Sequence, residues 1–125
     1  MKRVISTLKA PKAIATYSQA IEANGFLFIS GQIPINPETG LFIDGGIKEQ
    51  TEQVLKNIGA ILDSAGYSYK DIVKTTCILN DIRNYAQMNE VYLAYFHNES
   101  PARAAFAVKD LPLNALIEIE AIATK

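Results

Sequence analysis

Residues 47–65 have the regular spacing of hydrophobic side chains that marks an amphipathic α-helix. The side chains that share one face are Ile47, Thr51, Val54, Leu55, Ile58, Ile61, Leu62 and Ala65. Gly66 follows directly and supplies the left-handed residue with which many helices end. Gly59, inside the segment, lowers helix stability by about 1 kcal/mol relative to alanine, so we expect close packing against it. The fold must therefore bury one long helical face.

The region before this helix has the pattern of a β-hairpin. Residues 18–22 and 26–30 predict two strands, and Asn24-Gly25 between them is a strong signal for a tight turn. Residues 31–46 contain prolines and glycines and predict an irregular loop.

The region after the helix predicts three more strands and a second helix. Residues 71–79 are rich in β-branched side chains, and residues 103–108 and 116–123 predict the last two strands. The second helix is expected to begin near Asn84, with Gln87 three residues later as a loose capping box. Its expected buried stripe is Tyr85, Met88, Val91, Tyr92, Tyr95 and Phe96.

This order of elements, β-β-α-β-α-β-β, predicts a single α+β domain over residues 1–125, with both helices on one face of the sheet. In the last strand, Ile117, Ile119, Ala121 and Ala123 share one face, and Leu116, Glu118, Glu120 and Ile122 share the other. Helices on one side would leave the second face exposed in a monomer. Because that face mixes acids with apolar residues, it indicates a subunit interface that contains a polar site.

Composition excludes several classes of function. The chain has 12 Lys and Arg against 13 Asp and Glu without a basic run, so we do not expect nucleic-acid binding. Cys77 and His97 are the only residues of their types, so an intrachain disulfide or a Cys/His zinc site cannot form. We find neither a membrane-spanning run of about 20 apolar residues nor a secretory signal, and we expect a cytoplasmic protein without membrane partners.

Arg103 is the first candidate for chemistry, because it stands among small and apolar residues in an expected strand. A guanidinium stays charged when buried, and its planar fork holds a carboxylate through two parallel hydrogen bonds. A structural ion pair with Glu118 or another acid explains the same pattern equally well. Glu118 itself is a candidate general base that orients or deprotonates water. Simple alternation of acids on a solvent face is the alternative for Glu118 and the preferred interpretation for Glu120.

Other candidates have weaker signals. Gly31, directly after an apolar strand, lets a ligand approach backbone N–H groups, and Ser30 adds a hydroxyl donor, although a plain turn explains both residues. Tyr17 presents a phenol to a site or packs as an ordinary tyrosine. Asn89 borders the second helix's stripe, and our preferred interpretation is that it holds a loop by hydrogen bonds. We interpret Cys77 as a small core residue.

Several segments are similar in order and spacing to one known family, almost from end to end. They are Ala10-Pro11, Tyr17-Ser18-Gln19-Ala20, residues 29–34, 37–40 and 71–76, Asn89 with Tyr92, Pro101-Ala102-Arg103 and residues 117–123. Together they resemble the reactive intermediate deaminase family, also called YjgF/RidA, and its archetypal imine-deaminating branch. The resemblance implies a chorismate-mutase-like fold of the bacillary type, assembled as a homotrimer with sites between subunits. It also implies hydrolysis of 2-iminopropanoate and 2-iminobutanoate to 2-keto acids and ammonia, without a metal or organic cofactor.

The resemblance assigns roles to individual residues. The family's carboxylate-binding arginine falls on Arg103, its water-positioning glutamate on Glu118 and its site tyrosine on Tyr17. Its serine and glycine ligands fall on Ser30 and Gly31.

Two further residues complete the candidate substrate-binding set, Ala105 through its backbone N–H and Asn89. Many members have cysteine where this chain has Ala105, so a catalytic thiol is excluded there. Many members also have proline where this chain has Thr16, which loosens the turn before Tyr17. Two other functions remain open: a regulatory module that senses small carboxylates, and an endoribonuclease or translation inhibitor, which the balanced charge and single histidine disfavour.

Overall fold

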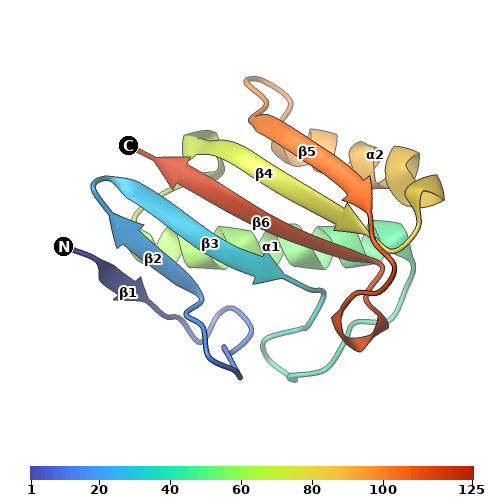
Figure 1. Ribbon diagram of the computed structural model, residues 1–125, viewed down its shortest axis with the longest axis horizontal. Coiled ribbons are helices and arrows are strands. Elements are labelled where there is room, and N and C mark those ends of the chain that lie inside the picture. The colour runs from blue at the N-terminus through green and yellow to red at the C-terminus, as the bar shows by residue number, and fades with distance from the viewer.

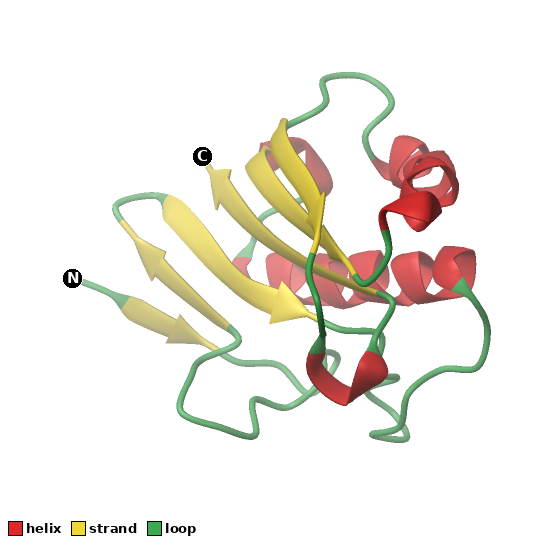
Figure 2. Cartoon of the chain, turned by 45° about the vertical axis from the view of Figure 1, so that its right-hand side comes forward, coloured by secondary structure: helices red, strands yellow, loops and turns green.

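The computed structural model describes residues 1–125 as a sheet covered on one face by two helices (Figures 1 and 2). The strands are β1 (Arg3–Ile5), β2 (Ala20–Ala23), β3 (Phe26–Gln32), β4 (Ile72–Leu79), β5 (Ala102–Ala107) and β6 (Ile117–Thr124). The helices are α1 (Ile47–Ala65) and α2 (Tyr85–Tyr95), and three short 3-10 turns lie at Tyr69–Asp71, Ile82–Asn84 and Pro112–Asn114. The predicted α+β class, with both helices on one face, is confirmed.

The sheet order is β1-β2-β3-β6-β4-β5, which makes β1 and β5 the two edges. Neighbouring strands are antiparallel except β4 and β5, which are parallel. Ile117, Ile119 and Ala121 of β6 are buried beneath the helices. The alternate residues of β6 point to the opposite face, which we call the open face. The prediction that Glu118 and Glu120 share a face away from the helices is therefore confirmed.

Helix α1 has the predicted bounds and ends at Gly66, whose φ of 82° is left-handed. The close packing expected at Gly59 is also present. A Cβ at this position would lie 2.7 Å from the Cζ atom of Tyr69, and the Tyr69 hydroxyl donates to the Leu55 carbonyl at 2.6 Å. The glycine thus allows a tyrosine to reach the backbone of α1.

One strand was missed, and two predictions about the ends of elements are wrong. β1 pairs with β2 but was not predicted, because three residues are too short to show alternation. β3 continues to Gln32, so Gly31 lies inside a strand rather than in the loop. Asn84 does not cap α2 through its side chain. A 3-10 turn precedes the helix, and Asp81 caps that turn by accepting from the Arg83 N–H.

Buried amide side chains hold the loops at one end of the sheet. The Gln19 Nε2 group donates to the Thr7 and Pro11 carbonyls at 3.0 and 2.8 Å, which fixes the segment before β2. The Asn57 Nδ2 group on α1 donates to the Ile33 and Ile35 carbonyls at 3.3 and 3.0 Å. Since a buried amide without partners is unfavourable, these bonds favour one loop arrangement. Neither helix is long and apolar enough to cross a lipid bilayer.

Candidate active site

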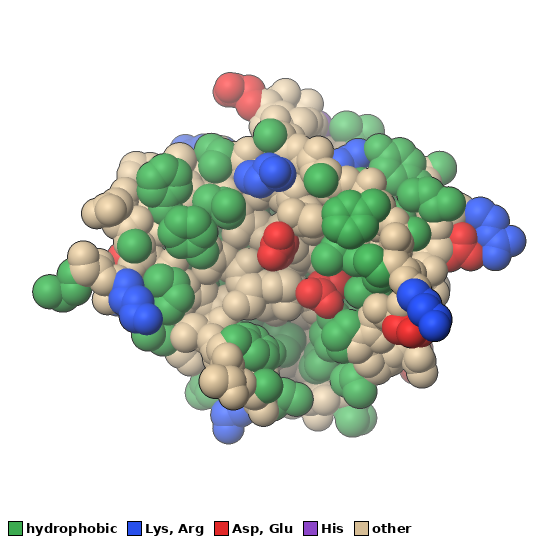
Figure 3. Space-filling view, in the orientation of Figure 1, with side chains coloured by type: hydrophobic (Ala, Val, Ile, Leu, Met, Phe, Trp, Pro, Cys, Tyr) green, Lys and Arg blue, Asp and Glu red, His purple; other side chains and the backbone are tan.

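A pocket of about 540 Å³ lies on the open face where β3 ends and β6 begins. Its walls come from the segment before β2, the end of β3 and its following loop, the 3-10 turn before β6, and β6 itself. The lining residues are Pro11, Lys12, Ile14, Tyr17, Ser30, Gly31, Gln32, Ile33, Ile35, Pro112, Leu113, Glu118 and Glu120. Four of the predicted site residues therefore meet here, namely Tyr17, Ser30, Gly31 and Glu118. Acidic side chains near the middle of this face are bordered by hydrophobic ones (Figure 3).

Glu118 lies directly against Gly31. A Cβ on Gly31 would come within 2.9 Å of the Glu118 Cδ atom, so any larger residue would push this carboxylate out of its position. Glu118 makes no hydrogen bond or salt bridge within the chain. Burial raises its pKa above the usual value, and the nearby charge of Glu120 raises it further. The result is a carboxylate without a partner that faces a pocket.

The backbone of β3 is irregular next to Glu118, and the sequence alone does not predict this irregularity. The pairing of β3 with β6 shifts between Ile29 and Gln32, so Ser30 and Gly31 form a bulge. Bulges redirect side chains and often lie next to active sites. This bulge brings Gly31 beneath the carboxylate of Glu118.

The structure corrects the expected role of the Ser30 hydroxyl and decides between the two interpretations of Tyr17. The Ser30 hydroxyl donates to the Ser18 carbonyl at 2.6 Å, so it presents an acceptor oxygen rather than the expected free donor. Tyr17 is not an ordinary packed tyrosine, because 50% of its surface is exposed at the pocket. Its phenol is accessible to a ligand.

Arg103 lies on β5 at the opposite edge of the sheet. Its Nη1 group donates to the Asn89 Oδ1 atom at 2.7 Å, and its Nη2 group donates to the Tyr85 hydroxyl at 2.6 Å. The guanidinium also stacks over the Tyr92 ring, 4.8 Å from its centroid. Every salt bridge of the chain involves other residues, so the structural ion pair considered for Arg103 is absent. Neutral partners hold the cation and leave its charge uncompensated.

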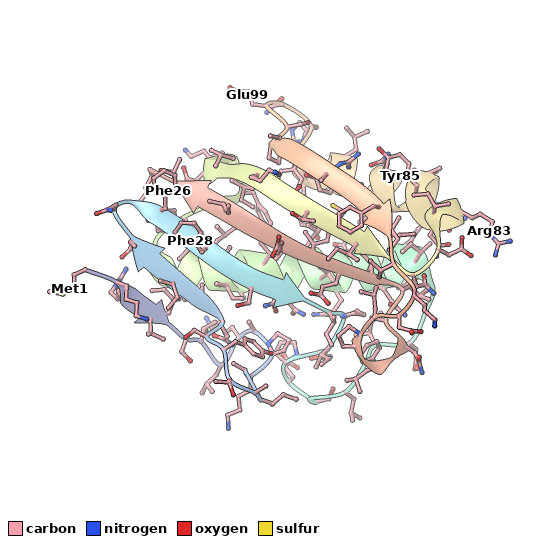
Figure 4. All side chains as sticks on the ribbon, viewed as in Figure 1. Met1, Phe26, Phe28, Arg83, Tyr85 and Glu99 are labelled. Carbon is pink, nitrogen blue, oxygen red and sulfur yellow. The ribbon has the colours of Figure 1, made fainter.

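The partners of Arg103 correct two expectations. Asn89 holds the guanidinium and does not hold a loop. Tyr85, assigned to the buried stripe of α2, is instead 36% exposed, and Figure 4 shows it on α2 beside β5. Met88, Tyr92 and Phe96 are the buried members of the stripe. An N–H···O contact from a strand to a helix depends on register, and the sequence carried no signal for Tyr85.

Ala105 lies two residues beyond Arg103 on β5. The Val108 N–H donates to the Leu79 carbonyl of β4. Because successive N–H groups of a strand point to opposite sides, the Ala105 N–H points away from β4, at the edge where no further strand follows. Cys77, opposite Ala105, is fully buried, and burial raises its pKa to about 11. Its prediction as a core residue is confirmed.

The predicted site residues thus form two half-sites on opposite faces of the sheet. Arg103 pairs in register with the buried Thr75, so its side chain lies on the helix side. Glu118 pairs with Ile78 and lies on the open face. One small ligand cannot contact both residues within a single chain.

Comparisons with known proteins identify the family of the chain. A family model described as endoribonuclease L-PSP matches residues 7–125. The chain belongs to the YjgF/RidA family. This family member is 58% identical to a RutC family protein of Pyrococcus horikoshii over 125 residues, with 100% of this chain and 99% of the relative covered. It is 48% identical to the human protein named 2-iminobutanoate/2-iminopropanoate deaminase, with 98% and 90% covered.

Solved structures give the same assignment. The chain superposes on a Rid family protein of Yersinia pestis with a TM-score of 0.97 and 51% identity, and both chains are fully covered. Relatives that are named deaminases are near 50% identical to this chain. Two archaeal relatives are more similar to it, at 58% and 56% identity, and carry only the RutC family name. These comparisons therefore establish the family of this RidA-type chain, and the names of its more similar relatives give no reaction.

Proposed function

We propose that this protein hydrolyses 2-imino acids such as 2-iminopropanoate and 2-iminobutanoate to 2-keto acids and ammonia, at sites completed between copies of the chain in a homotrimer. One observation carries the proposal: an arginine and a glutamate, each without an ionic partner, lie on opposite faces of the same sheet. A second copy that brings its β5 edge to the open-face pocket joins the two charges at one ligand. The human relative, 48% identical, is named for deamination of the same two imino acids.

Features of the open face support assembly. Phe26 and Phe28 of β3 and Phe106 of β5 point away from the helices and are 42%, 44% and 43% exposed; Figure 4 labels the first two on this face. Exposed aromatic side chains on one face of a sheet are typical of interfaces between subunits. The β5 edge that carries Arg103 lies at the periphery of the sheet, where it is accessible to a partner (Figure 1).

The chemistry follows from the charges. Arg103 binds the substrate carboxylate through its remaining N–H groups and fixes the position of C2. Glu118 accepts a proton from water as the water oxygen bonds to C2 of the protonated imine, which gives a carbinolamine. The carboxyl of Glu118 then returns this proton to the amine. The C–N bond breaks, and Glu118 accepts the hydroxyl proton as the carbonyl forms. This proton then passes to the departing ammonia or to water, which restores the carboxylate of Glu118.

The bound imine needs only modest assistance, because it is already electrophilic. The Ala105 N–H at the β5 edge is directed toward the space where a partner's pocket would lie, and it adds a donor for the carboxylate. None of these steps requires a metal or organic cofactor. A carboxylate sensor would use the same anchoring residues, and it would differ by binding keto acids without accelerating imine loss.

Mixing two inactive variants tests the shared site. We expect Arg103→Ala and Glu118→Gln to be inactive separately, and to regain activity after joint dissociation and reassembly. Random pairing of the two chains places an intact Arg103 next to an intact Glu118 in about a quarter of the sites. The assay generates 2-iminopropanoate from serine with a dehydratase and follows the loss of imine absorbance. If the reassembled mixture has the mass of a trimer but does not regain activity, a site between copies is contradicted.

The hydroxyl of Tyr85 provides a separate prediction. Tyr85→Phe removes the hydroxyl that accepts from the Arg103 Nη2 group, so the guanidinium keeps only one of the two hydrogen bonds that orient it. We expect KM for 2-iminopropanoate to rise about three- to tenfold, the range for loss of one ordinary hydrogen bond at a partly exposed position, with little change in kcat. Steady-state kinetics checks this result. Tyr95→Phe, on the same helix, removes a hydroxyl that bonds Glu52 instead and serves as the control.

A further inference from the structure

The 3-10 turn Pro112–Asn114 holds an apolar side chain in an unusual conformation. Leu113 has φ 54° and ψ 29°, and Asn114 follows with φ 59°. Asparagine tolerates the left-handed region, whereas leucine is disfavoured there because its Cβ crowds the backbone. Leu113 is also 67% exposed. The turn therefore presents a leucine to solvent where a polar residue would fit better.

Leu113 belongs to an apolar rim around the open-face pocket. We define this rim as Ile14, Tyr17, Ile33, Ile35 and Leu113, which come from three separate loops. Ile14 is 82% exposed and Tyr17 is 50% exposed. Buried amides fix two of these loops, through Gln19 before β2 and Asn57 after β3. The rim is thus a built feature above the carboxylate of Glu118.

Within a single chain, the pocket has more space than the simplest substrates fill. Its volume is about 540 Å³. An imino acid of about six non-hydrogen atoms fills on the order of a third of that space at ~30 Å³ per water-sized group. When C2 of the substrate lies near Glu118 and the substrate carboxylate points to a partner's Arg103, the substrate side chain points toward the rim.

We propose that the rim binds the apolar side chain of the substrate, so that the protein prefers imino acids with side chains of about three to five carbons over 2-iminopropanoate. This inference rests on the proposed function. Each methylene group transferred from water to an apolar surface favours binding by about fourfold. Contact with the substrate removes Leu113 and Ile14 from water, which accounts for their position beside a charged floor.

The test compares two imines in the assembled protein. Oxidation of leucine or alanine by an amino-acid oxidase supplies 2-imino-4-methylpentanoate or 2-iminopropanoate, and semicarbazide trapping measures the loss of each. The variants are Leu113→Asn, which suits the left-handed turn, and Ile14→Ser. Leu41→Ser is the control, because Leu41 is 68% exposed but does not line the pocket.

We expect the wild type to favour the leucine-derived imine in kcat/KM by about tenfold or more, as two or more buried carbons predict. Leu113→Asn and Ile14→Ser should each reduce this ratio by about three- to fivefold, and Leu41→Ser should leave it unchanged. A ratio unaffected by both rim variants overturns the inference. So does an equal loss for both imines together with a lower mass in light scattering, which would mean that a partner subunit covers the rim.

A binding measurement separates this inference from the proposed function. If the wild type accelerates neither imine, the proposed function fails, and calorimetry with 4-methyl-2-oxopentanoate and pyruvate then tests the rim alone. Tighter binding of the larger keto acid, reduced in Leu113→Asn, supports the rim as an apolar binding surface. Equal binding of the two keto acids overturns it.

Discussion

Replacing Arg103 by alanine is expected to lower kcat/KM for 2-iminopropanoate by about 10³-fold. A pair of hydrogen bonds between charged groups contributes roughly 4 kcal/mol, and each 1.4 kcal/mol corresponds to a factor of ten. The charge of Arg103 is free for this task, because Asn89 and Tyr85 are neutral partners. Imine loss measured over a series of substrate concentrations checks the result.

Two further substitutions make this prediction specific to the guanidinium fork. Arg103→Lys keeps the charge but not the paired donors, so its activity should lie between wild type and Arg103→Ala. Lys12→Ala removes a positive charge from the wall of the open-face pocket itself, and we expect less than about a twofold change from this solvated group. A larger effect of Lys12→Ala than of Arg103→Ala would identify Lys12 as the anchor and contradict the two half-sites.

The sequence predicted those parts of the fold that depend on local patterns. Helix α1 has the expected bounds because a long apolar periodicity ends at a glycine. The hairpin turn is present at Asn24 and Gly25, whose φ values of 52° and 79° are the positive ones such a turn requires. Both features are encoded by residues close together in the chain.

The arrangement of the site depends on register between distant strands, which single-chain periodicity does not contain. Arg103 lies on the helix side only because β5 pairs in parallel with β4 so that it is opposite Thr75. The bulge at Ser30 and Gly31, and the contact of Tyr85 with Arg103, likewise follow from pairing and packing. Resemblance to a family nominated the residues, and the structure shows that a single chain holds Arg103 and Glu118 on opposite faces of the sheet.

Replacing Glu118 by glutamine is expected to lower kcat by about 10²–10⁴-fold, the usual contribution of a general base. The variant keeps the shape of the side chain above Gly31 but cannot accept a proton. Burial and the nearby charge of Glu120 raise the pKa of Glu118. As pH is lowered, the wild-type rate should therefore begin to decrease at a higher pH than an ordinary carboxyl group would give. The variant should lack this pH dependence, and rate profiles from acid to neutral pH check it.

The same pKa shift predicts an opposite effect on stability. The folded protein holds the Glu118 proton more tightly than the unfolded chain, so wild-type stability decreases as pH rises from the unfolded pKa through the folded one. Glutamine does not incur this loss, and Glu118→Gln should melt at a higher temperature at neutral pH, with the difference vanishing in acid. Glu120→Gln is the matched control, because removing its charge lowers the pKa of Glu118 and moves the acid limb to lower pH. A Glu118→Gln variant that is both active and no more stable would show that this carboxylate is neither the base nor a destabilised group.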